Sequence, residues 1–352
     1  MPRFSYFWLI PNSQQVLPSL MSCRFKFLLL VLLLCLCSFV HAASNTLHHK
    51  VIVITGASSG FGKGIALKLA SEGATVVLAA RRTQLLEEIA QQCRQLGGNA
   101  LVATTDVASE QDVERLAQRT LNSFGRIDVW INNAGVGAFG RFDEVPLADH
   151  KRLMDINLNG TLYGSYYAMR QFRQQHYGSL INIASVMGKV PLPYYASYTA
   201  SKHAIVGLDA AINQELQVNN ERNIHVTTIM PFAADTPWFN HTANYSGKSP
   251  RMIALDHPDK IINAVIKAIH HPQKEIAVGY KAKLALASHR ISSRLTNALA
   301  GRAGHKIMIQ DPPPASQTSG TLYKPMAEGT GIVGGIKQRV ELEDLVLEQQ
   351  QR

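Results

Sequence analysis

Two residues four positions apart, Tyr198 and Lys202, have the types and the spacing required for proton transfer. They lie where an apolar run gives way to a helical pattern. Residues four apart share one face of a helix, so we expect the lysine ammonium to lie beneath the tyrosine ring. A nearby cation favours the phenolate and lowers the tyrosine pKa from about 10 towards neutrality. The pair therefore predicts a proton donor and acceptor that works near physiological pH.

A hydroxyl group at Ser185 extends this chemistry. Ser185 lies thirteen residues before Tyr198 and directly after residues 179–184, which read as a buried strand. At the exit of that strand the hydroxyl would hold a substrate oxygen against the tyrosine. Two plainer readings stay open: Ser185 is a turn residue, and the tyrosine–lysine spacing arises by chance among 11 tyrosines. The elements that position these residues decide between them.

A glycine-rich turn follows the first predicted strand, residues 50–55, and opens a helix. Its spacing is Gly-x-x-x-Gly-x-Gly. Glycines there allow a tight turn and let backbone N–H groups approach a pyrophosphate at the helix N-terminus. The alternative is a simple strand-to-helix turn without a ligand. The residues that we expect around the pyrophosphate are Thr55, Gly56, Ser58, Ser59, Gly60, Phe61 and Gly62.

The ends of the next two strands carry charged residues that would select the nucleotide. NAD would call for an acidic residue after the second strand, but Arg81 and Arg82 stand there. Guanidinium groups suit a 2′-phosphate, so we predict NADP(H), with Arg81 the stronger candidate; solvated helix-cap charges are the alternative. Asp106 and Val107 close the third strand, where the carboxylate would accept from the adenine amino group or cap the next helix.

Strands and helices alternate along most of the chain. This alternation is typical of a parallel sheet covered on both faces, and right-handed crossovers make it a doubly wound, Rossmann-like α/β fold. We predict strands at 50–55, 74–80, 100–105, 127–132, 179–184, 224–230 and 275–280, and helices at 60–73, 83–96, 109–124, 147–176, 197–218 and 257–270. Residues 48–280 then form a single catalytic domain, in which residues 231–255 are expected to be a mobile loop over the site.

Composition limits the class of protein. The 352 residues suffice for one large domain with a sizeable core. The formal net charge is +10, but no dense basic block with interleaved aromatics is present, so we expect a solvated basic surface and no nucleic-acid partner. Cys93 alone among the four cysteines lies outside the first 40 residues. It is expected to be half-buried filler, and neither a disulfide framework nor a metal site is predicted.

Residues 1–43 are predicted to be an N-terminal leader. After Met21, an alternative start, a short basic head precedes the apolar residues 27–40 and a small-residue flank. This layout is that of a secretory signal, and the apolar stretch is short for a spanning helix of about 20 residues. Because an enzyme that uses a nicotinamide needs a compartment that supplies it, we expect a membrane anchor and hence membrane association. A cleaved signal with export is the alternative.

The C-terminal part departs from the alternating pattern. Residues 281–302 carry five basic and no acidic residues, with apolar residues at helical spacing. They predict a basic amphipathic helix, which either lies on a membrane surface or packs against the domain. Residues 303–352 are rich in Pro, Gly, Ser and Gln, and they are predicted to be a largely unstructured tail.

Taken together, these residues resemble the short-chain dehydrogenase/reductase family in its compact single-domain form. The resemblance covers residues 48–280, and five elements agree in order and spacing. They are the glycine turn after Thr55, Asp106, the Asn-Asn-Ala-Gly run at 132–135, Asn157, and Ser185 with Tyr198 and Lys202. One departure is Pro231-Phe232, where the family usually has Pro-Gly, so the fit of a nicotinamide against this loop is open.

The resemblance implies a role for each matching residue. Tyr198 is the general acid/base, Ser185 polarises the substrate oxygen, and Lys202 lowers the tyrosine pKa and holds the nicotinamide ribose. Asn157 supports a water that links Lys202 to solvent, or else it caps a helix kink. The residues implied in cofactor binding besides those of the turn and the strand ends are Asn133, Ala134, Gly135, Tyr198, Lys202, Pro231 and Thr236.

The function implied is an oxidoreductase that transfers hydride between NADP(H) and a secondary alcohol, ketone or aldehyde. Apolar residues near the site indicate an apolar small-molecule substrate: Val186, Met187, Val190, Leu192, Tyr194, Tyr195, Trp238 and Phe239. A homodimer or homotetramer is implied by the resemblance alone. The alternative function is an NADP(H)-binding sensor or scaffold without turnover. The complete Ser/Tyr/Lys/Asn set argues against it, because a pure binder needs none of these side chains.

Overall fold

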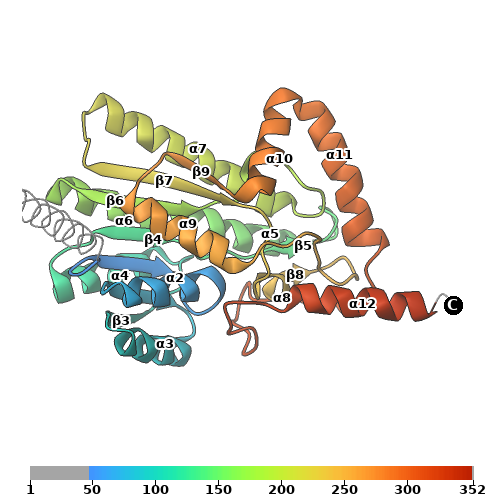
Figure 1. Ribbon diagram of the computed structural model, residues 1–352, viewed down its shortest axis with the longest axis horizontal. Coiled ribbons are helices and arrows are strands. Elements are labelled where there is room, and N and C mark those ends of the chain that lie inside the picture. Colours follow the sequence, from blue (N-terminus) through green and yellow to red (C-terminus); the bar gives the residue numbers. More distant parts are fainter. Residues whose placement is uncertain (1–46, 351–352) are drawn as a thin grey trace, which may run out of the picture. The chain divides into compact units, whose positions relative to one another are not determined.

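A computed structural model describes residues 47–350 of the chain (Figure 1). Its centre is a seven-stranded, all-parallel sheet with the order β3-β2-β1-β4-β6-β7-β9. The strands are β1 Val51–Thr55, β2 Thr75–Ala80, β3 Asn99–Thr104, β4 Val129–Asn132, β6 Gly178–Ile183, β7 Ile224–Pro231 and β9 Glu275–Val278. The predicted doubly wound Rossmann-like sheet is confirmed, because the strand order reverses direction between β1 and β4.

Alternate residues of each strand face opposite layers of helices, as the two-residue period of a strand requires. In β1, Ile52 and Ile54 belong to one core cluster, whereas Val51 and Val53 belong to the other. Both faces are apolar, which is why these strands read as continuous apolar runs in the sequence. The buried Cys93 lies in the first cluster, from α3, where burial raises the pKa of its thiol to about 11.

Three helices cover one face of the sheet and four helical segments cover the other. The first layer is formed by α2 Gly60–Ser71, α3 Thr83–Gln95 and α9 Pro258–His270. The second is formed by α4 Glu110–Phe124, α5 Leu147–Met154, α6 Gly160–Gln175 and α7 Ala196–Val218. Each of these helices belongs to a connection between two parallel strands, so the chain crosses one face of the sheet before it enters the next strand.

The long helix predicted over 147–176 is interrupted. A π-helical segment, η2 Asp155–Asn159, separates α5 from α6. Its Asn157 is fully buried and bonds to the main chain of Val136 in both directions, with Val136 N to Oδ1 at 2.8 Å and Nδ2 to Val136 O at 3.0 Å. A widened turn of this kind is frequent at functional sites.

The segment expected to be a mobile loop, 231–255, contains short elements that are tied to the domain. The helix α8 Trp238–His241 is followed by β8 Ala243–Asn244, which pairs with β5 Ala138–Phe139 in a second, two-stranded sheet. The peptide Tyr245 N–H also donates to Phe139 O at 2.7 Å. These contacts hold α8 at the C-terminal edge of the main sheet.

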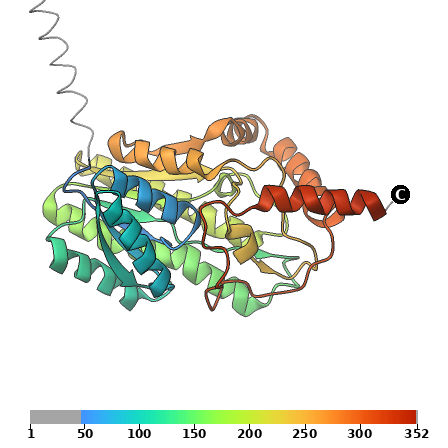
Figure 2. The same cartoon turned by 60° about the horizontal axis from the view of Figure 1, so that its bottom comes forward.

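The C-terminal part differs from the sequence prediction. Residues 281–302 lie in two helices, α10 Gly279–Ile291 and α11 Ser293–His305, which are separated at Ser292, an extended residue that caps α11. The prediction of a largely unstructured tail is wrong for 303–350. After the π-helical η4 Lys306–Gln310, a connecting segment folds back beside α8 and leads into α12 Ile336–Gln350 (Figures 1 and 2). The glycine and proline residues of this segment lie in a stretch of chain that is hydrogen-bonded to the rest of the domain.

The predicted leader, with its apolar residues 27–40 and Met21, lies outside the described residues. Between residues 47 and 350, no helix combines the length and the apolar character needed to cross a bilayer.

Candidate active site

A cavity of about 850 Å³ opens at the C-terminal edge of the main sheet. In open α/β sheets, ligands bind in the crevice outside this edge. The glycine turn after β1 lines one part of the cavity, and the residues that follow β6 and begin α7 line another. Ser185, Tyr198 and Lys202 therefore border the same space as the glycine turn, from which more than 120 residues separate them in the sequence.

Two glycines of the turn lie where the surrounding backbone leaves no room for a side chain. Gly56 has φ +66°, and a Cβ atom there would lie 2.8 Å from the Cα of Ala134. At Gly62 a Cβ atom would lie 2.3 Å from the carbonyl oxygen of Gly56. The turn residues that line the cavity are Gly56, Ser58, Ser59, Gly60 and Phe61. The close backbone approach is the geometry expected where main-chain N–H groups meet a phosphate.

Thr55 and Asn133 hold the turn in place. The Thr55 hydroxyl accepts from the N–H groups of Asn133 (3.0 Å) and Ala134 (3.1 Å), and the Asn133 side-chain amide donates to the carbonyls of Thr55 (2.9 Å) and Gly56 (3.2 Å). Asn133, Ala134 and Gly135 also line the cavity. The run at 132–135 thus fixes the ends of β1 and β4 relative to each other, besides bordering the cavity.

Tyr198, Lys202 and Ser185 meet on the opposite side. Lys202 Nζ lies 5.6 Å from the centroid of the Tyr198 ring, as the four-residue spacing on α7 requires, and it donates to the Ile183 carbonyl at 2.7 Å. Lys202 is only 4% exposed. The Ser185 hydroxyl accepts from Met187 N at 3.1 Å at the start of η3 Val186–Gly188, so it also has the turn role considered for it.

The predicted shift of the tyrosine pKa is wrong in sign for this structure. Burial raises the pKa of Tyr198 to about 12, and the hydrogen bond with Ser185 only partly offsets that effect. Burial also lowers the pKa of Lys202 to about 8. Desolvation disfavours both charged forms and outweighs the attraction between cation and phenolate. At neutral pH Tyr198 is therefore a neutral phenol.

Asn157 supports the wall of the cavity beneath these residues. Besides its two bonds to Val136, its Nδ2 donates to Ser201 Oγ at 3.2 Å, and that hydroxyl donates to the carbonyl of Tyr198 at 2.7 Å. Gly135 lies between Asn157 and Lys202, because a Cβ atom there would be 3.6 Å from both Asn157 Oδ1 and Lys202 Nζ. Asn157 is thus coupled to α7 at the turn that carries Tyr198.

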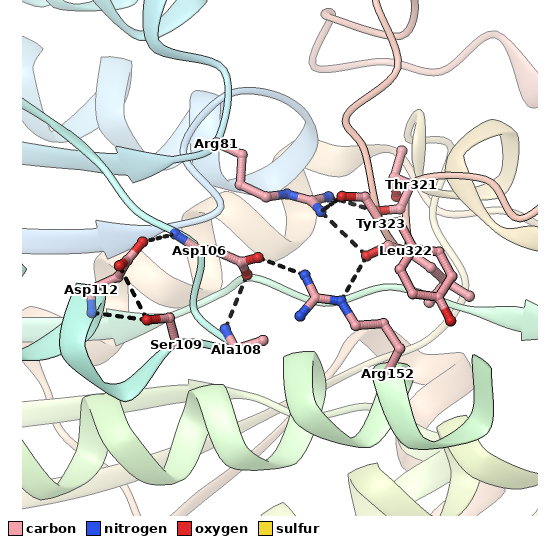
Figure 3. Close-up of polar contacts among 9 residues, drawn as sticks. All are labelled: Arg81, Asp106, Ala108, Ser109, Asp112, Arg152, Thr321, Leu322 and Tyr323. Carbon is pink, nitrogen blue, oxygen red and sulfur yellow. Dashed lines mark hydrogen bonds and ion pairs between the residues drawn. The ribbon is translucent and has the colours of Figure 1, made fainter. Parts of the chain in front are cut away.

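Arg81 and Arg82 both line the cavity at the end of β2, but protein groups engage them. Arg82 donates to Ser58 Oγ (3.0 Å) and Ser59 Oγ (2.8 Å) of the glycine turn. Arg81 donates to main-chain carbonyls of residues 321–323 (Figure 3). Neither is a simple solvated charge, as the alternative reading had it.

Asp106 has a partner that sequence reasoning missed. Arg152 Nη2 on α5 donates to Asp106 Oδ2 at 2.6 Å, while Ala108 N donates to Asp106 Oδ1 at 3.1 Å (Figure 3). The residue that caps α4 is Ser109, not Asp106. The Asp106 carboxylate borders the cavity together with Val107. No local sequence signal links Arg152 to this site, since 46 residues separate it from Asp106.

The end of β7 closes the nucleotide side of the cavity. Pro231, the last residue of β7, and Thr236 both line it, and so does Phe232, where the family usually has glycine. Thr236 is buried. The close backbone approach at Gly56 and Gly62 and the arginines at the strand end fit a dinucleotide. The residues that would hold it are therefore all at one edge of the sheet.

Apolar and aromatic residues border the remaining part of the cavity. Tyr195 stacks on Phe139 with ring centroids 5.2 Å apart, and Trp238 lies 5.2 Å from the Tyr198 ring. Tyr194, predicted to line the pocket, is not among the lining residues, and its hydroxyl contacts His305 Nδ1 at 2.6 Å instead. Other lining residues are Val186, Met187, Val190, Leu192 and Phe239, joined by Leu284, Ser288, Thr296, Leu299, Ala303 and Ile307 from the C-terminal helices.

A sequence model described as short chain dehydrogenase matches residues 50–245. An uncharacterised oxidoreductase of Bacillus subtilis is 33% identical over 79% of this chain and 78% of its own length. An 11-beta-hydroxysteroid dehydrogenase-like protein of Arabidopsis thaliana is 36% identical over 60% of this chain and 66% of its own. The sensor or scaffold alternative gains no support from such relatives.

Solved structures of oxidoreductases are also similar to this chain. A short-chain dehydrogenase/reductase from Burkholderia phymatum in complex with NAD has a TM-score of 0.63 at 26% identity, covering 71% of this chain and 95% of that one. An alcohol dehydrogenase from Thermococcus sibiricus complexed with 5-hydroxy-NADP has a TM-score of 0.56 at 28% identity, covering 65% and 93%.

Proposed function

The chain belongs to the short-chain dehydrogenase/reductase family, and we propose that it transfers hydride between NADP(H) and an apolar secondary alcohol, ketone or aldehyde. That it is an oxidoreductase follows from the family. One observation carries the finer proposal. The buried Lys202 and the residues Tyr198 and Ser185 border the same cavity as a glycine turn in which Gly56 and Gly62 leave no room for a Cβ atom.

In the direction of reduction, this chain's residues handle the oxygen and the proton. A bound nicotinamide supplies the hydride that reaches the carbonyl carbon. Ser185 orients the carbonyl oxygen, and Tyr198 donates its hydroxyl proton to that oxygen as the C=O double bond becomes a C–OH group. The raised pKa of Tyr198, about 12, keeps the phenol protonated for this step at neutral pH. The ammonium of Lys202 favours the phenolate that is left until it takes up a proton again.

The choice of NADP(H) rests on the two arginines at the end of β2. Arg81 and Arg82 stand where NAD selection calls for an acidic group, and guanidinium groups pair well with a phosphate. The Thermococcus sibiricus relative, complexed with a modified NADP, supports this choice, whereas the Burkholderia phymatum relative was solved with NAD. The coenzyme preference therefore needs a direct measurement.

An apolar substrate is supported by the aromatic and aliphatic lining near Tyr198. Tyr195 and Trp238 line the cavity, and the Trp238 ring packs against the rings of Tyr195 (5.9 Å between centroids) and Tyr198 (5.2 Å). Such a pocket favours a ligand that is mostly hydrocarbon with one oxygen to be positioned. The relatives that are named after 11-beta-hydroxysteroid dehydrogenases support a steroid-like or lipid-like carbonyl compound as the substrate.

A panel of ketones and aldehydes tests the proposal. Oxidation of NADPH and of NADH is measured with each compound, together with the binding of both coenzymes to the same protein. We expect turnover with apolar carbonyl compounds and a preference for NADPH. Tight coenzyme binding without turnover across a broad panel would favour the sensor instead, and equal use of NADH would reject the coenzyme choice.

For localisation, we propose that residues 27–40 associate the enzyme with a membrane. The support is their apolar run behind a basic head. Fractionation of the full chain beside a chain that starts at Ser44 is the test, and equal solubility of the two unprocessed forms would reject the anchor. Assembly into a homodimer or homotetramer stays a prediction.

A further inference from the structure

The segment between η4 and α12 runs across the nucleotide side of the cavity. We define the strap as residues 320–335. Its Gly331 carbonyl accepts from the N–H of Gly60 in the glycine turn at 2.9 Å. One turn further along α2, Lys63 Nζ donates to the Thr330 carbonyl at 3.2 Å. The strap is thus bonded to the N-terminal turn of the helix at which a pyrophosphate is expected.

The strap also engages both arginines at the end of β2. Arg81 donates to the carbonyls of Thr321 (2.6 Å), Leu322 (3.3 Å) and Tyr323 (3.3 Å), and Arg82 donates to those of Met326 (3.2 Å) and Glu328 (3.4 Å). Arg152, the partner of Asp106, donates to the Leu322 carbonyl at 3.0 Å (Figure 3). Every one of these acceptors is a main-chain oxygen, so the strap holds the guanidinium groups without using a side chain.

The strap borders the cavity and leaves it open beneath. Thr321, Pro325 and Met326 line the same space as Gly60 and Asp106. A tail that merely filled this site would remove the space, whereas here it adds an outer wall to it. The nucleotide end is therefore enclosed between the strand ends on one side and the strap on the other.

The C-terminal end of the strap is fastened to the loop after β7. The N–H of Gly334 donates to the Asp235 carbonyl at 3.1 Å, and the N–H of Ile336 donates to Asp235 Oδ1 at 2.8 Å. Ile336 itself is 0% exposed. At Gly334 a Cβ atom would lie 2.3 Å from the backbone of Thr236, so the strap approaches a cavity-lining residue as closely as a main chain can.

An ion pair and a hydrogen bond fasten the helix that follows. On α12, Asp344 pairs with the buried Arg251 at 2.5 Å, and Arg339 Nη1 donates to Asn240 Oδ1 at 2.6 Å. Both partners lie in the segment that carries α8. The strap is thus attached at its two ends, through Arg81 at the start and through α12 after its last residue.

We propose that the strap is a coenzyme-binding element of this enzyme, an outer wall that retains the coenzyme and must open for its entry and release. The inference rests on the proposed function, because it presumes that the enclosed space is the coenzyme site. Three kinds of group expected to bind the coenzyme contact the strap: a main-chain N–H of the turn, the strand-end guanidinium groups and the loop of Thr236. Opening the strap breaks these contacts, so exchange of the coenzyme is slowed in both directions.

Ile336→Asp tests this inference, because it introduces a charge at a buried anchor that does not line the cavity. The matched control is Leu342→Asp on the same helix, where the side chain is 64% exposed. Stopped-flow fluorescence of NADPH gives its association and dissociation rate constants for the full-length wild type and both variants. For Ile336→Asp we expect dissociation at least about 10-fold faster, association also faster, and weaker binding. Leu342→Asp should match the wild type.

A second variant keeps the test informative if Ile336→Asp perturbs folding, which circular dichroism and thermal unfolding would report. Arg339→Ala removes the contact with Asn240 while leaving the buried anchor intact, and it should speed dissociation by about three- to fivefold. Dissociation rates equal to wild type in a folded variant would overturn the proposal. So would faster dissociation in Leu342→Asp of the same size as in Ile336→Asp.

Failure of the inference is distinct from failure of the proposed function. If the wild type binds neither NADPH nor NADH, the function is wrong and the strap covers something else. If it binds NADH better, the coenzyme choice is wrong, and the same rate measurements with NADH decide on the strap. If it binds NADPH tightly and the anchor variants release it at the wild-type rate, only the strap inference is lost.

Discussion

Two regions of this enzyme border one cavity by different means. The framework, residues 47–278, contributes through side-chain identity and backbone shape: a turn closed to Cβ atoms, a tyrosine above a lysine, arginines at a strand end. The C-terminal region, residues 279–350, contributes main-chain carbonyls that hold the arginines and a cavity lining of mixed aliphatic and polar side chains. The first region can be recognised by residue type. The second acts through main-chain carbonyls, which every residue has, so its role can be recognised only from the folded structure.

The two regions should also differ in how strongly single substitutions affect them. In the framework, buried polar groups must be satisfied by particular partners, and replacing one leaves the other desolvated and unpaired. In the C-terminal region the acceptors are carbonyls, and substitution of a strap side chain does not remove them. We therefore expect the largest effects of single substitutions in the framework and graded effects in the C-terminal region.

After Tyr198, the largest framework effect is expected at Lys202. Lys202→Met removes the buried cation beside Tyr198, and we expect kcat for carbonyl reduction to fall about 100-fold or more, as for loss of a proton-transfer group. Steady-state oxidation of NADPH measures it. A fall of less than about 10-fold would show that the Lys202 cation does not take part in the reaction.

The pH dependence sharpens this prediction. Burial lowers the pKa of Lys202 to about 8, so its charged form is lost as pH rises through that value. The kcat/KM for the coenzyme follows groups of the free enzyme, and we expect it to decline above about pH 8. In Lys202→Arg the guanidinium stays charged, so the residual activity should lack this decline. The same inflection in both proteins would contradict the assignment.

Gly62 is expected to give the next largest effect. A Cβ atom in Gly62→Ala would meet the Gly56 carbonyl at 2.3 Å and the Asn133 amide at 2.6 Å. Because the turn must shift to admit it, we expect coenzyme binding about 100-fold weaker and a loss of about 1–3 kcal/mol in stability. Titration of NADPH fluorescence and thermal unfolding measure the two effects.

The matched control is Gly207→Ala, an exposed position inside α7 with no atom within 4 Å of the added methyl group. There alanine should stabilise the protein by up to about 1 kcal/mol through helix propensity. Equal behaviour of the two variants would mean that the close approach in the turn is not required.

The patterns in the sequence explain how much of this was predictable. The strands of the main sheet follow from continuous apolar runs such as 51–55, because both faces of each strand are buried. The glycine turn and the Tyr198–Lys202 pair were identifiable because their chemistry depends on residue type. The break at 155–159 was not, since nothing in Asp-Ile-Asn-Leu-Asn signals a π-helix, and the polar side chain of the buried Asn157 is satisfied by Val136 and Ser201, which are distant in the sequence.

The strap was misread for a related reason. Its five glycines and one proline lower the apparent tendency to order, yet Gly334 is required for a backbone approach to Thr236, and Leu322 in the strap and Ile336 directly after it are fully buried. Isolated apolar residues in a polar segment were the available signal. The sign of the Tyr198 pKa shift was also beyond the sequence, because it depends on how far burial outweighs the effect of a neighbouring charge.

Arg81 should give an intermediate effect, because it lines the cavity as part of the framework and also bonds to the strap of the C-terminal region. Arg81→Ala removes a charge-assisted partner of a 2′-phosphate, so NADPH affinity should fall about 10-fold or more while NADH affinity changes about threefold or less. Parallel titrations with both coenzymes measure this. Equal losses would mean that Arg81 serves mainly to hold the strap, through residues 321–323, and does not select the coenzyme.

The smallest effect is expected in the C-terminal helices. Leu299 lines the cavity although it is 57% exposed, and Leu299→Ala should lower kcat/KM for an apolar ketone by about three- to fivefold through KM. Ile291→Ala is the matched control, because Ile291 is 86% exposed and does not line the cavity. A change in kcat instead of KM would mean that α11 helps to position the reacting groups. We assign that role to the framework alone.

The most direct test is a single-turnover measurement on Tyr198→Phe, with coenzyme binding determined on the same sample. With enzyme in excess over NADPH and a saturating ketone, we expect the rate constant for NADPH oxidation to fall by about 10²- to 10⁴-fold, the usual contribution of a positioned acid. The dissociation constant for NADPH should stay within about twofold of wild type, because only the hydroxyl is removed. A rate constant within about 10-fold of wild type would contradict the assignment of Tyr198 as the proton donor.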